Sequence, residues 1–320
     1  MAIQFGRNAF VKTGEESGYG TGASFTVSNR IFSCTLTKNV ERTQKTYLST
    51  SSGAFSKGHF DVITNVTGTI EVPLQYNGSG IWLKAACGFA SSTGSSPPYT
   101  HTYNPNTSAL GSLAVQFQRG SGSSEEFTGL MVNTLTISGV AGEEVKMSLD
   151  FIGKDAQART GAVSSSFGTG KEAFHYESSG LKVTPQGSGL TTYTMRNFEL
   201  SITNSLETRQ VLGSLLTESP DVTDIRTATL SVTADLEDDD IYNLQLAGTA
   251  CTLQIVFTET GGSGNTITIN MYNAILTSYD DSVSTVGRLE RTMEFQGFAD
   301  ASNEACSIVI VNQESSSIAN

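Results

Sequence analysis

The sequence is poor in charged residues, in histidine and in long apolar runs, and each shortage argues against a class of function. Only 16% of its 320 residues are Asp, Glu, Lys or Arg, and only three are histidines, His59, His101 and His175. The four cysteines, Cys34, Cys87, Cys251 and Cys306, form no CxxC pair, so no metal-ligand spacing exists. No run of about 18 apolar residues is present to cross a membrane. We therefore expect no metal, no cofactor and no membrane partner.

The amino terminus, MAIQFGRNAF, lacks the basic and then apolar pattern of a secretion signal. We expect the chain to stay in a reducing cytoplasm after synthesis. Cys34 and Cys87 have apolar neighbours, which predicts buried free thiols.

Enzyme motifs are absent as well. The chain has no GxSxG, no P-loop and no dinucleotide fingerprint. Two pairs of acids recur at matched positions, Glu41 with Glu207 and Asp150 with Glu294. A carboxylate pair for sugar hydrolysis is formally open, but each acid falls on the polar side of an expected strand. We predict that the protein is not an enzyme.

The net charge is −12. A protein that grips nucleic acid through its phosphates needs the opposite sign, so displayed acids would repel DNA. Solubility alone is the simplest explanation of such a charge.

What the sequence has instead is Gly, Ser, Thr and β-branched residues, a bias that predicts an all-β protein with many turns. Its 320 residues exceed the usual size of a single core, which favours about two domains.

The two halves of the chain resemble each other in four collinear blocks. SCTLTKNVERTQ (33–44) aligns without a gap to ELSITNSLETRQ (199–210). GTIEVPLQYNGSGIWLKAACG (68–88) aligns to ATLSVTADLEDDDIYNLQLAG (228–248). LAVQF (113–117) pairs with LQIVF (253–257), an offset that also brings Asn133 onto Asn273, and MSLDFIG (147–153) pairs with TMEFQG (292–297). Four pairs of similar blocks in the same order indicate a tandem duplication.

The shared blocks predict strands and one short helix in each half. Ile70, Val72 and Leu74 alternate with polar neighbours, as in a strand with one buried face. GIWLKAACG and IYNLQLAG have helical spacing and end at Gly88 and Gly248, which suit a carboxyl-terminal cap. Trp82 and Tyr242 occupy matched apolar positions, and core packing is favoured over a sugar-binding platform.

The acids Glu237–Asp240 precede the second helix and suit its amino terminus. A calcium loop is the alternative, but the spaced ligands of an EF-hand are missing.

We expect two antiparallel β-sandwich or open-barrel domains, at 1–158 and 172–302, joined by a small, polar linker at 159–171. Each has a long arm, 45–66 in the first and 211–227 in the second, that contacts something outside its own domain. The extension at 303–320 holds the apolar run CSIVIVN, which can add a strand to its own or to a neighbour's sheet.

Several blocks together resemble a known family. FVKTGEESGYGT (10–21), GTIEVPLQY followed by GIWLKAACG, PYTHTYNP, and NTLTISGVAGEEVKMSLDFIGKD are similar to bacteriophage tail tube proteins, the major tail proteins of long-tailed phages. The resemblance covers most of the chain, and no single motif in it is diagnostic. It implies a β-sandwich with a flanking helix and a long loop, in subunits that stack as rings around a DNA channel.

The resemblance also implies partners and a place in the virion. Two fused domains per chain suggest trimeric rings of six quasi-equivalent domains, with Glu41, Glu71, Asp150, Glu207 and Glu294 as candidates to line an acidic bore. Double-stranded DNA would pass without specific binding. Expected partners are further copies of the chain, the tape measure protein, the tail terminator and the baseplate or tip proteins. The protein would assemble in the bacterial cytoplasm into the virion tail. The alternative is a carbohydrate-binding or adhesin module, and a hydrolase is a weaker one.

Overall fold

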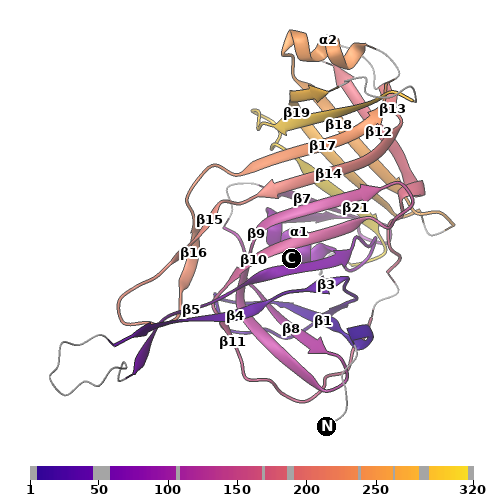
Figure 1. Cartoon of the computed structure of the whole chain (residues 1–320). Coiled ribbons are helices and arrows are strands. Elements are labelled where there is room, and N and C mark those ends of the chain that lie inside the picture. The colour runs from indigo at the N-terminus through magenta and orange to yellow at the C-terminus, as the bar shows by residue number, and fades with distance from the viewer. Residues whose placement is uncertain are drawn as a thin grey trace.

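The structure, a computed structural model, describes residues 6–45, 58–105, 109–167, 170–185, 191–236, 239–261, 264–280 and 288–315 (Figure 1). The predicted fold class is confirmed: strands dominate, all named strand pairs are antiparallel, and each half contains one short α-helix, α1 (Gly80–Cys87) and α2 (Asp240–Ala247). A short 3-10 turn, η1 (Gly6–Asn8), precedes the first strand, and a second, η2 (His175–Glu177), precedes the second half.

The strands of the first half surround α1. They are β1 (Phe10–Glu15), β2 (Val27–Asn29), β3 (Ser33–Cys34), β4 (Thr37–Gln44), β5 (His59–Pro73), β6 (Gly88–Thr93), β7 (Tyr99–Pro105), β8 (Leu113–Arg119), β9 (Ser123–Val140), β10 (Lys146–Gly153) and β11 (Asp155–Ala156).

The second half follows in a similar order around α2. Its strands are β12 (Ser178–Pro185), β13 (Thr191–Tyr193), β14 (Met195–Thr203), β15 (Leu206–Arg209), β16 (Glu218–Val222), β17 (Thr227–Asp235), β18 (Cys251–Thr258), β19 (Thr266–Asp280), β20 (Glu290–Gly297) and β21 (Ser307–Asn312).

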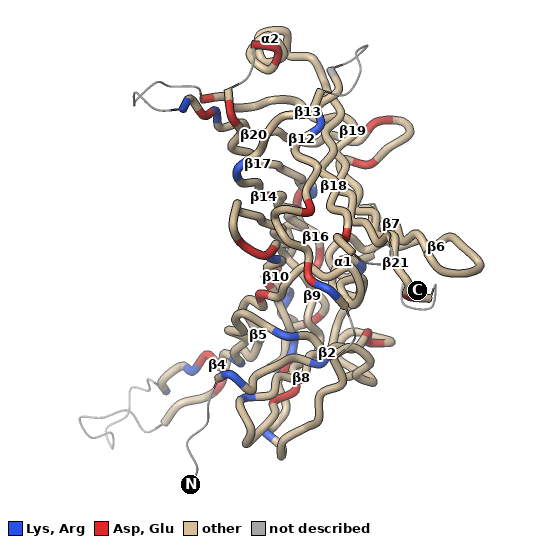
Figure 2. The backbone as a smooth tube through the Cα atoms, turned by 90° about the vertical axis from the view of Figure 1, so that its right-hand side faces the viewer, with Lys and Arg blue, Asp and Glu red and all other residues tan. Residues whose placement is uncertain are grey.

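One long sheet runs through both halves. Its pairing order is β3 and β4, then β5, β10, β9, β14, β17, β20 and β19. The step from β9 to β14 joins the halves, with Thr134 opposite Thr203 and Asn197 opposite Val140. Figure 2 shows the chain from the side, with β5, β10, β14 and β17 following one another along its length.

Each half closes its core with a second layer of strands. In the first half this layer is β2, β1, β8 and the start of β9; in the second it is β13, β12, β18 and the start of β19. β9 and β19 are long enough to belong to both layers, and each carries a β-bulge where it enters the long sheet. The same pairing order therefore occurs twice in one chain.

The bulges correct one of the sequence alignments. The extra residue of β9 is Asn133, between Val132 and Thr134, and that of β19 is Thr277, between Leu276 and Ser278. Asn133 is thus equivalent to Thr277, and the expected match with Asn273 is wrong by four residues. Apolar residues are frequent enough in both strands for a shifted alignment to look equally good.

The carboxyl-terminal strand β21 pairs within its own chain. It lies between β19 of the second half and β7 of the first. The hairpin β6–β7 follows α1 directly, whereas only Gly248, Thr249 and Ala250 separate α2 from β18. The β6–β7–β21 ribbon therefore has no counterpart after α2.

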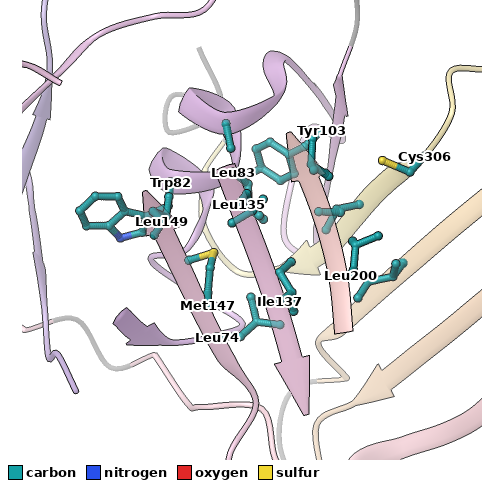
Figure 3. Close-up of a cluster of buried hydrophobic side chains, with 14 of the residues drawn as sticks. Leu74, Trp82, Leu83, Tyr103, Leu135, Ile137, Met147, Leu149, Leu200 and Cys306 are labelled. Atoms are coloured by element: carbon teal, nitrogen blue, oxygen red, sulfur yellow. The ribbon is translucent and has the colours of Figure 1, made fainter. Parts of the chain in front are cut away.

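A single apolar core extends across both halves (Figure 3). Leu135 and Ile137 of β9 pack beside Leu200 of β14, beneath α1. Trp82 is fully buried, with its ring edge against Phe151, as predicted. The same prediction for Tyr242 is wrong, because its side chain is 44% exposed on α2.

Both helices end as the sequence predicts. Gly88 and Gly248 have φ of 83° and 60° and donate backbone hydrogen bonds to the last turn. Of the four acids before α2, Asp239 is the cap residue without a side-chain hydrogen bond, Asp240 begins the helix, and residues 237–238 lie outside the described part.

Candidate functional site

The polar face of the long sheet is a surface of hydroxyl groups. Along β5, β9, β10, β14, β17 and β20 the core-facing positions are mainly apolar, so the alternate positions point the other way. Glu71 pairs with Ser148, Ser148 with Thr136, Thr136 with Ser201 and Ser201 with Thr229, which makes one row across five strands. A parallel row passes through Thr69, Asp150, Thr134 and Thr203.

Three of the five predicted channel acids lie on this face. They are Glu71 on β5, Asp150 on β10 and Glu294 on β20. The structure adds Glu199, which pairs with Ser138 and Ser231, in the same row as Glu294. Sequence reasoning missed Glu199 because its repeat partner is Ser33, although its alternation with Phe198 and Leu200 was a usable signal.

Arg196 of β14 is a cation at this face and pairs with Asp235 and Glu290 at 2.9 and 3.0 Å. Lys146 of β10 is a second one, among the residues described on the central strands. Its Nζ lies 3.1 Å from Glu143 Oε2, and the hydrogen bond and charge of Glu143 raise the pKa of Lys146. The face therefore combines neutral hydroxyls with acids, and its cations Lys146 and Arg196 are both paired with carboxylates.

The other two predicted acids, Glu41 and Glu207, lie on projecting hairpins. Glu41 is on β4, opposite Ile63 of β5, and Glu207 is on β15, opposite Asp221 of β16. We call β4 with the start of β5 the first arm, and β15 with β16 the second arm. The first arm starts at Thr37, earlier than the expected residue 45, because β4 itself forms one of its strands; residues 46–57 lie outside the described part.

The two arms touch each other within the chain. The Thr64 backbone N–H donates to Leu215 O at 2.7 Å, and the Gln210 side-chain amide donates to Val62 O at 3.0 Å. Between these contacts, Leu212 is fully exposed at the turn of the second arm. The surface of the arms is thus apolar in places, with Phe60, Val211, Leu215, Val222 and Ile225 also exposed.

The long sheet ends in two open edges. In the described residues, β3 pairs only with β5, and the end of β19 from Ser278 to Asp280 pairs only with β20. These edges are the equivalents of β14 and β9, the two strands that pair at the centre of the chain. β4 and α2 mark opposite ends of the molecule (Figures 1 and 2).

A buried carboxylate fixes the two halves to each other. Glu177, 6% exposed, accepts hydrogen bonds from Tyr76 Oη of the first half, Lys171 Nζ of the linker and the Thr260 backbone N–H of the second half, at 2.8–2.9 Å. Burial acts to raise the pKa of Glu177, but these hydrogen bonds outweigh it and lower the pKa. Burial and the Glu177 carboxylate raise the pKa of Tyr76.

No catalytic arrangement emerges from the described residues. His101, the buried histidine, hydrogen-bonds with Ser92 Oγ and Asn312 Oδ1 and so links the strands of the β6–β7–β21 ribbon. The searched part of the chain holds no cluster of three metal-ligating side chains and no helix with the length and apolarity to cross a bilayer. Burial raises the pKa of the Cys87 and Cys251 thiols to about 12, and all four cysteines are free.

Comparison with known proteins identifies the family. The family model described as phage tail tube protein matches residues 6–297, which include both halves and both arms. Among curated proteins no relative matches this chain. Because the family match covers most of the sequence, the chain belongs to the phage tail tube protein family and is a structural subunit of a phage tail tube.

Proposed function

We propose that three copies of this chain close into a ring and that stacked rings conduct double-stranded DNA through a bore lined by the polar face of the long sheet. The two halves would have arisen by tandem duplication. One observation carries the proposal: the open edges of the long sheet are the repeat equivalents of the strands that already pair at its centre.

The central pair shows how two copies would join. Thr134 of β9 lies opposite Thr203 of β14. The bulge alignment makes Ser278 the equivalent of Thr134, and the sequence blocks make Thr37 the equivalent of Thr203. Ser278 of one chain would therefore face Thr37 of the next, and Tyr279 would face Leu36. Such a head-to-tail contact closes into a ring when its rotation allows.

The size fits a duplex. Each half contributes four strand positions to the long sheet, counting β3 with β4 as one, so three chains contribute about 24 strands. At a spacing of ~4.8 Å and a tilt of ~40°, the barrel is about 48 Å across between backbones. Side chains leave a bore that still passes DNA, and closure covers both open edges of the long sheet.

The charge fits transport without binding. Three chains would carry −36, from −12 each. On the proposed lining, Glu71, Asp150, Glu199 and Glu294 repel phosphates, whereas Lys146 is neutralised by Glu143 and Arg196 by Asp235 and Glu290. The arms beyond Lys38 and Asn204 would contact the adjacent ring, which assigns Glu41 and Glu207 to ring stacking rather than to the bore wall. Tape measure, terminator and tip proteins are the further partners proposed, with assembly in the bacterial cytoplasm.

Hydrogen exchange on the full chain tests the proposal with an internal control. Within 33–37 and 277–280, the amides that do not bond to β5 or β20 should exchange fast in the monomer and become protected in tubes; Thr35, which donates to Thr69 O, is not among them. Amides of 134–140 and 197–203 should be protected in both states, because their pairing is within the chain. Electron microscopy should show hollow tubes or three-fold rings. Monomers at high concentration that bind glycans, or tubes in which the two edges stay unprotected, would contradict the proposal.

A further inference from the structure

The two helices differ in what covers them. Trp82 and Ala86 lie one turn apart on α1 and are both fully buried. Their equivalents on α2, Tyr242 and Leu246, are 44% and 69% exposed. The sequence is apolar at both positions of α2, so this helix presents an uncovered apolar face.

The second half of the chain supplies the cover at the end of α1. The Asn204 side-chain amide donates to Ala86 O at 2.9 Å and to Val132 O at 2.8 Å. Arg226 donates to the oxygens of Ala86 and Cys87, both at 3.0 Å, and its Nε donates to Asn204 Oδ1 at 2.8 Å. The last carbonyls of a helix have no partner inside it, so these donors satisfy groups that α1 cannot satisfy itself.

The end of α2 lacks such donors. Gly248 caps the oxygens of Leu244 and Gln245. Within the described residues, no side chain donates to the oxygens of Leu246 and Ala247, which are the equivalents of Ala86 and Cys87. The β6–β7–β21 ribbon that flanks α1 also has no counterpart here.

We infer that the Tyr242–Leu246 face of α2 docks on the first half of a second copy of this chain within the ring, and that Lys38 of this second copy donates to the last carbonyls of α2. The inference rests on the proposed ring. The internal joint is the basis for it. Within one chain, the second half covers α1, and in the proposed ring the first half of the next chain takes the corresponding position beside α2.

Position and charge support this occupant. Lys38 is the repeat equivalent of Asn204, and its side chain is 36% exposed. It donates to Ala156 O and pairs with Asp155, which leaves one of its three N–H groups for another acceptor. A lysine suits the carboxyl-terminal end of a helix. Asp239 and Asp240 lie at the start of α2 and Asp280 ends β19, whereas Glu290 of β20 is paired with Arg196.

Substitution of the exposed face tests the inference. Leu246→Asp should raise the protein concentration needed for ring formation by about tenfold or more, because a carboxylate would be buried in the joint. Lys38→Met should raise it about threefold. Phe89→Asp is the matched control, since Phe89 is 38% exposed and lies on β6, outside α2 and β4, and should leave the concentration within about twofold. Sedimentation velocity measures assembly, and urea unfolding of each monomer confirms folding.

A cysteine pair provides the second measurement. Lys38→Cys combined with Leu246→Cys should form disulfides between chains in assembled protein and give covalent dimers and trimers on a denaturing gel. Neither single variant should do so. Asn204→Cys with Ala86→Cys, the equivalent pair inside one chain, should close without linking chains.

The outcomes separate this inference from the proposed function. If the unaltered chain forms tubes and Leu246→Asp forms them equally well, the docking assignment fails and the ring stands. Leu246→Asp protein that forms trimers but no tubes would place the face between rings and would also overturn the assignment. A chain that never associates would overturn both.

Discussion

The N-terminal and C-terminal halves share a strand order but differ in how far their helices are buried. Seven of the eight residues of α1 are buried, whereas in α2 only Ile241 and Leu244 are. The difference does not come from the helices alone. α1 is covered by elements later in the same chain, namely Asn204, Arg226 and the β6–β7–β21 ribbon. In the described residues, α2 contacts β19, where Tyr242 lies against Tyr279, but it has no counterpart of that cover. A repeat unit thus relies on the unit that follows it, and the last unit is left with an open surface.

The largest difference in stability between the two helices is expected at the equivalent positions Trp82 and Tyr242. Trp82→Ala removes a buried indole that donates to Asn29 Oδ1 at 3.1 Å and contacts Phe151, so it should cost about 3–5 kcal/mol of unfolding free energy. Tyr242→Ala, at the equivalent exposed position, should cost under about 1 kcal/mol in the monomer. Urea unfolding of the two variants measures the gap. Equal losses would show that α2 is as buried as α1.

The joint between the halves can be weakened at Glu177. Glu177→Gln should destabilise the chain by about 2–3 kcal/mol at neutral pH, because Lys171 and the Thr260 N–H lose a buried carboxylate partner. The folded-state pKa of Glu177 is lowered, so its stabilisation is present above the unfolded value near 4.5 and is lost as the pH falls through the folded pKa. The gap between the two proteins should therefore shrink below about pH 4.5. A gap of the same size at every pH would rule out the charge as its cause.

The hydrogen-bond donors at the end of α1 should contribute less to the free energy of unfolding than the core residues beneath this helix. Arg226→Ala leaves the oxygens of Ala86 and Cys87 without these donors and should cost about 1–2 kcal/mol. Arg209→Ala is the control: Arg209 makes one exposed ion pair with Asp221, and its loss should change stability by under about 0.5 kcal/mol. Thermal unfolding compares the two, and equal effects would argue against a structural role for the cap.

The smallest effect is expected at the helix ends. Gly248→Ala places a Cβ at φ of 60° with no atom within 4 Å, so backbone strain alone should cost about 1 kcal/mol. Gly111→Ala, which also meets no atom within 4 Å but lies outside the positive-φ region, should be neutral. Calorimetry of both variants isolates the strain. A neutral Gly248→Ala would mean that the end of α2 is free to rearrange.

Much of this architecture could be predicted from the sequence. Alternation in 68–74 and 147–151 gave the strands and their buried faces, and Gly88 and Gly248 gave the helix ends. These signals are local, since a side chain's period and a glycine's φ depend on a few neighbouring residues. The alternation on β5, β10 and β20 also placed Glu71, Asp150 and Glu294 on a polar face. Their role in lining a bore remains a prediction.

The rest depended on contacts distant in sequence. Pattern alone placed Tyr242 in the core, because an apolar residue at helical spacing looks the same whether or not something covers it. It also placed Glu41 and Glu207 beside the other acids, because a strand that leaves the sheet as an arm keeps the same alternation. Which strand pairs with which is set by backbone groups that are identical in every residue.

Residue type and short-range spacing are therefore enough to predict the all-β class, the similarity of the two halves, the helix ends and the acidic charge. Contacts distant in sequence account for the pairing of β9 with β14, for the cover of α1 by Asn204 and Arg226, and for the open positions at β3, β19 and α2. Those outcomes depend on where the chain runs in space, and the hydrogen-bonding groups of an uncovered edge look the same in sequence as those of a covered one.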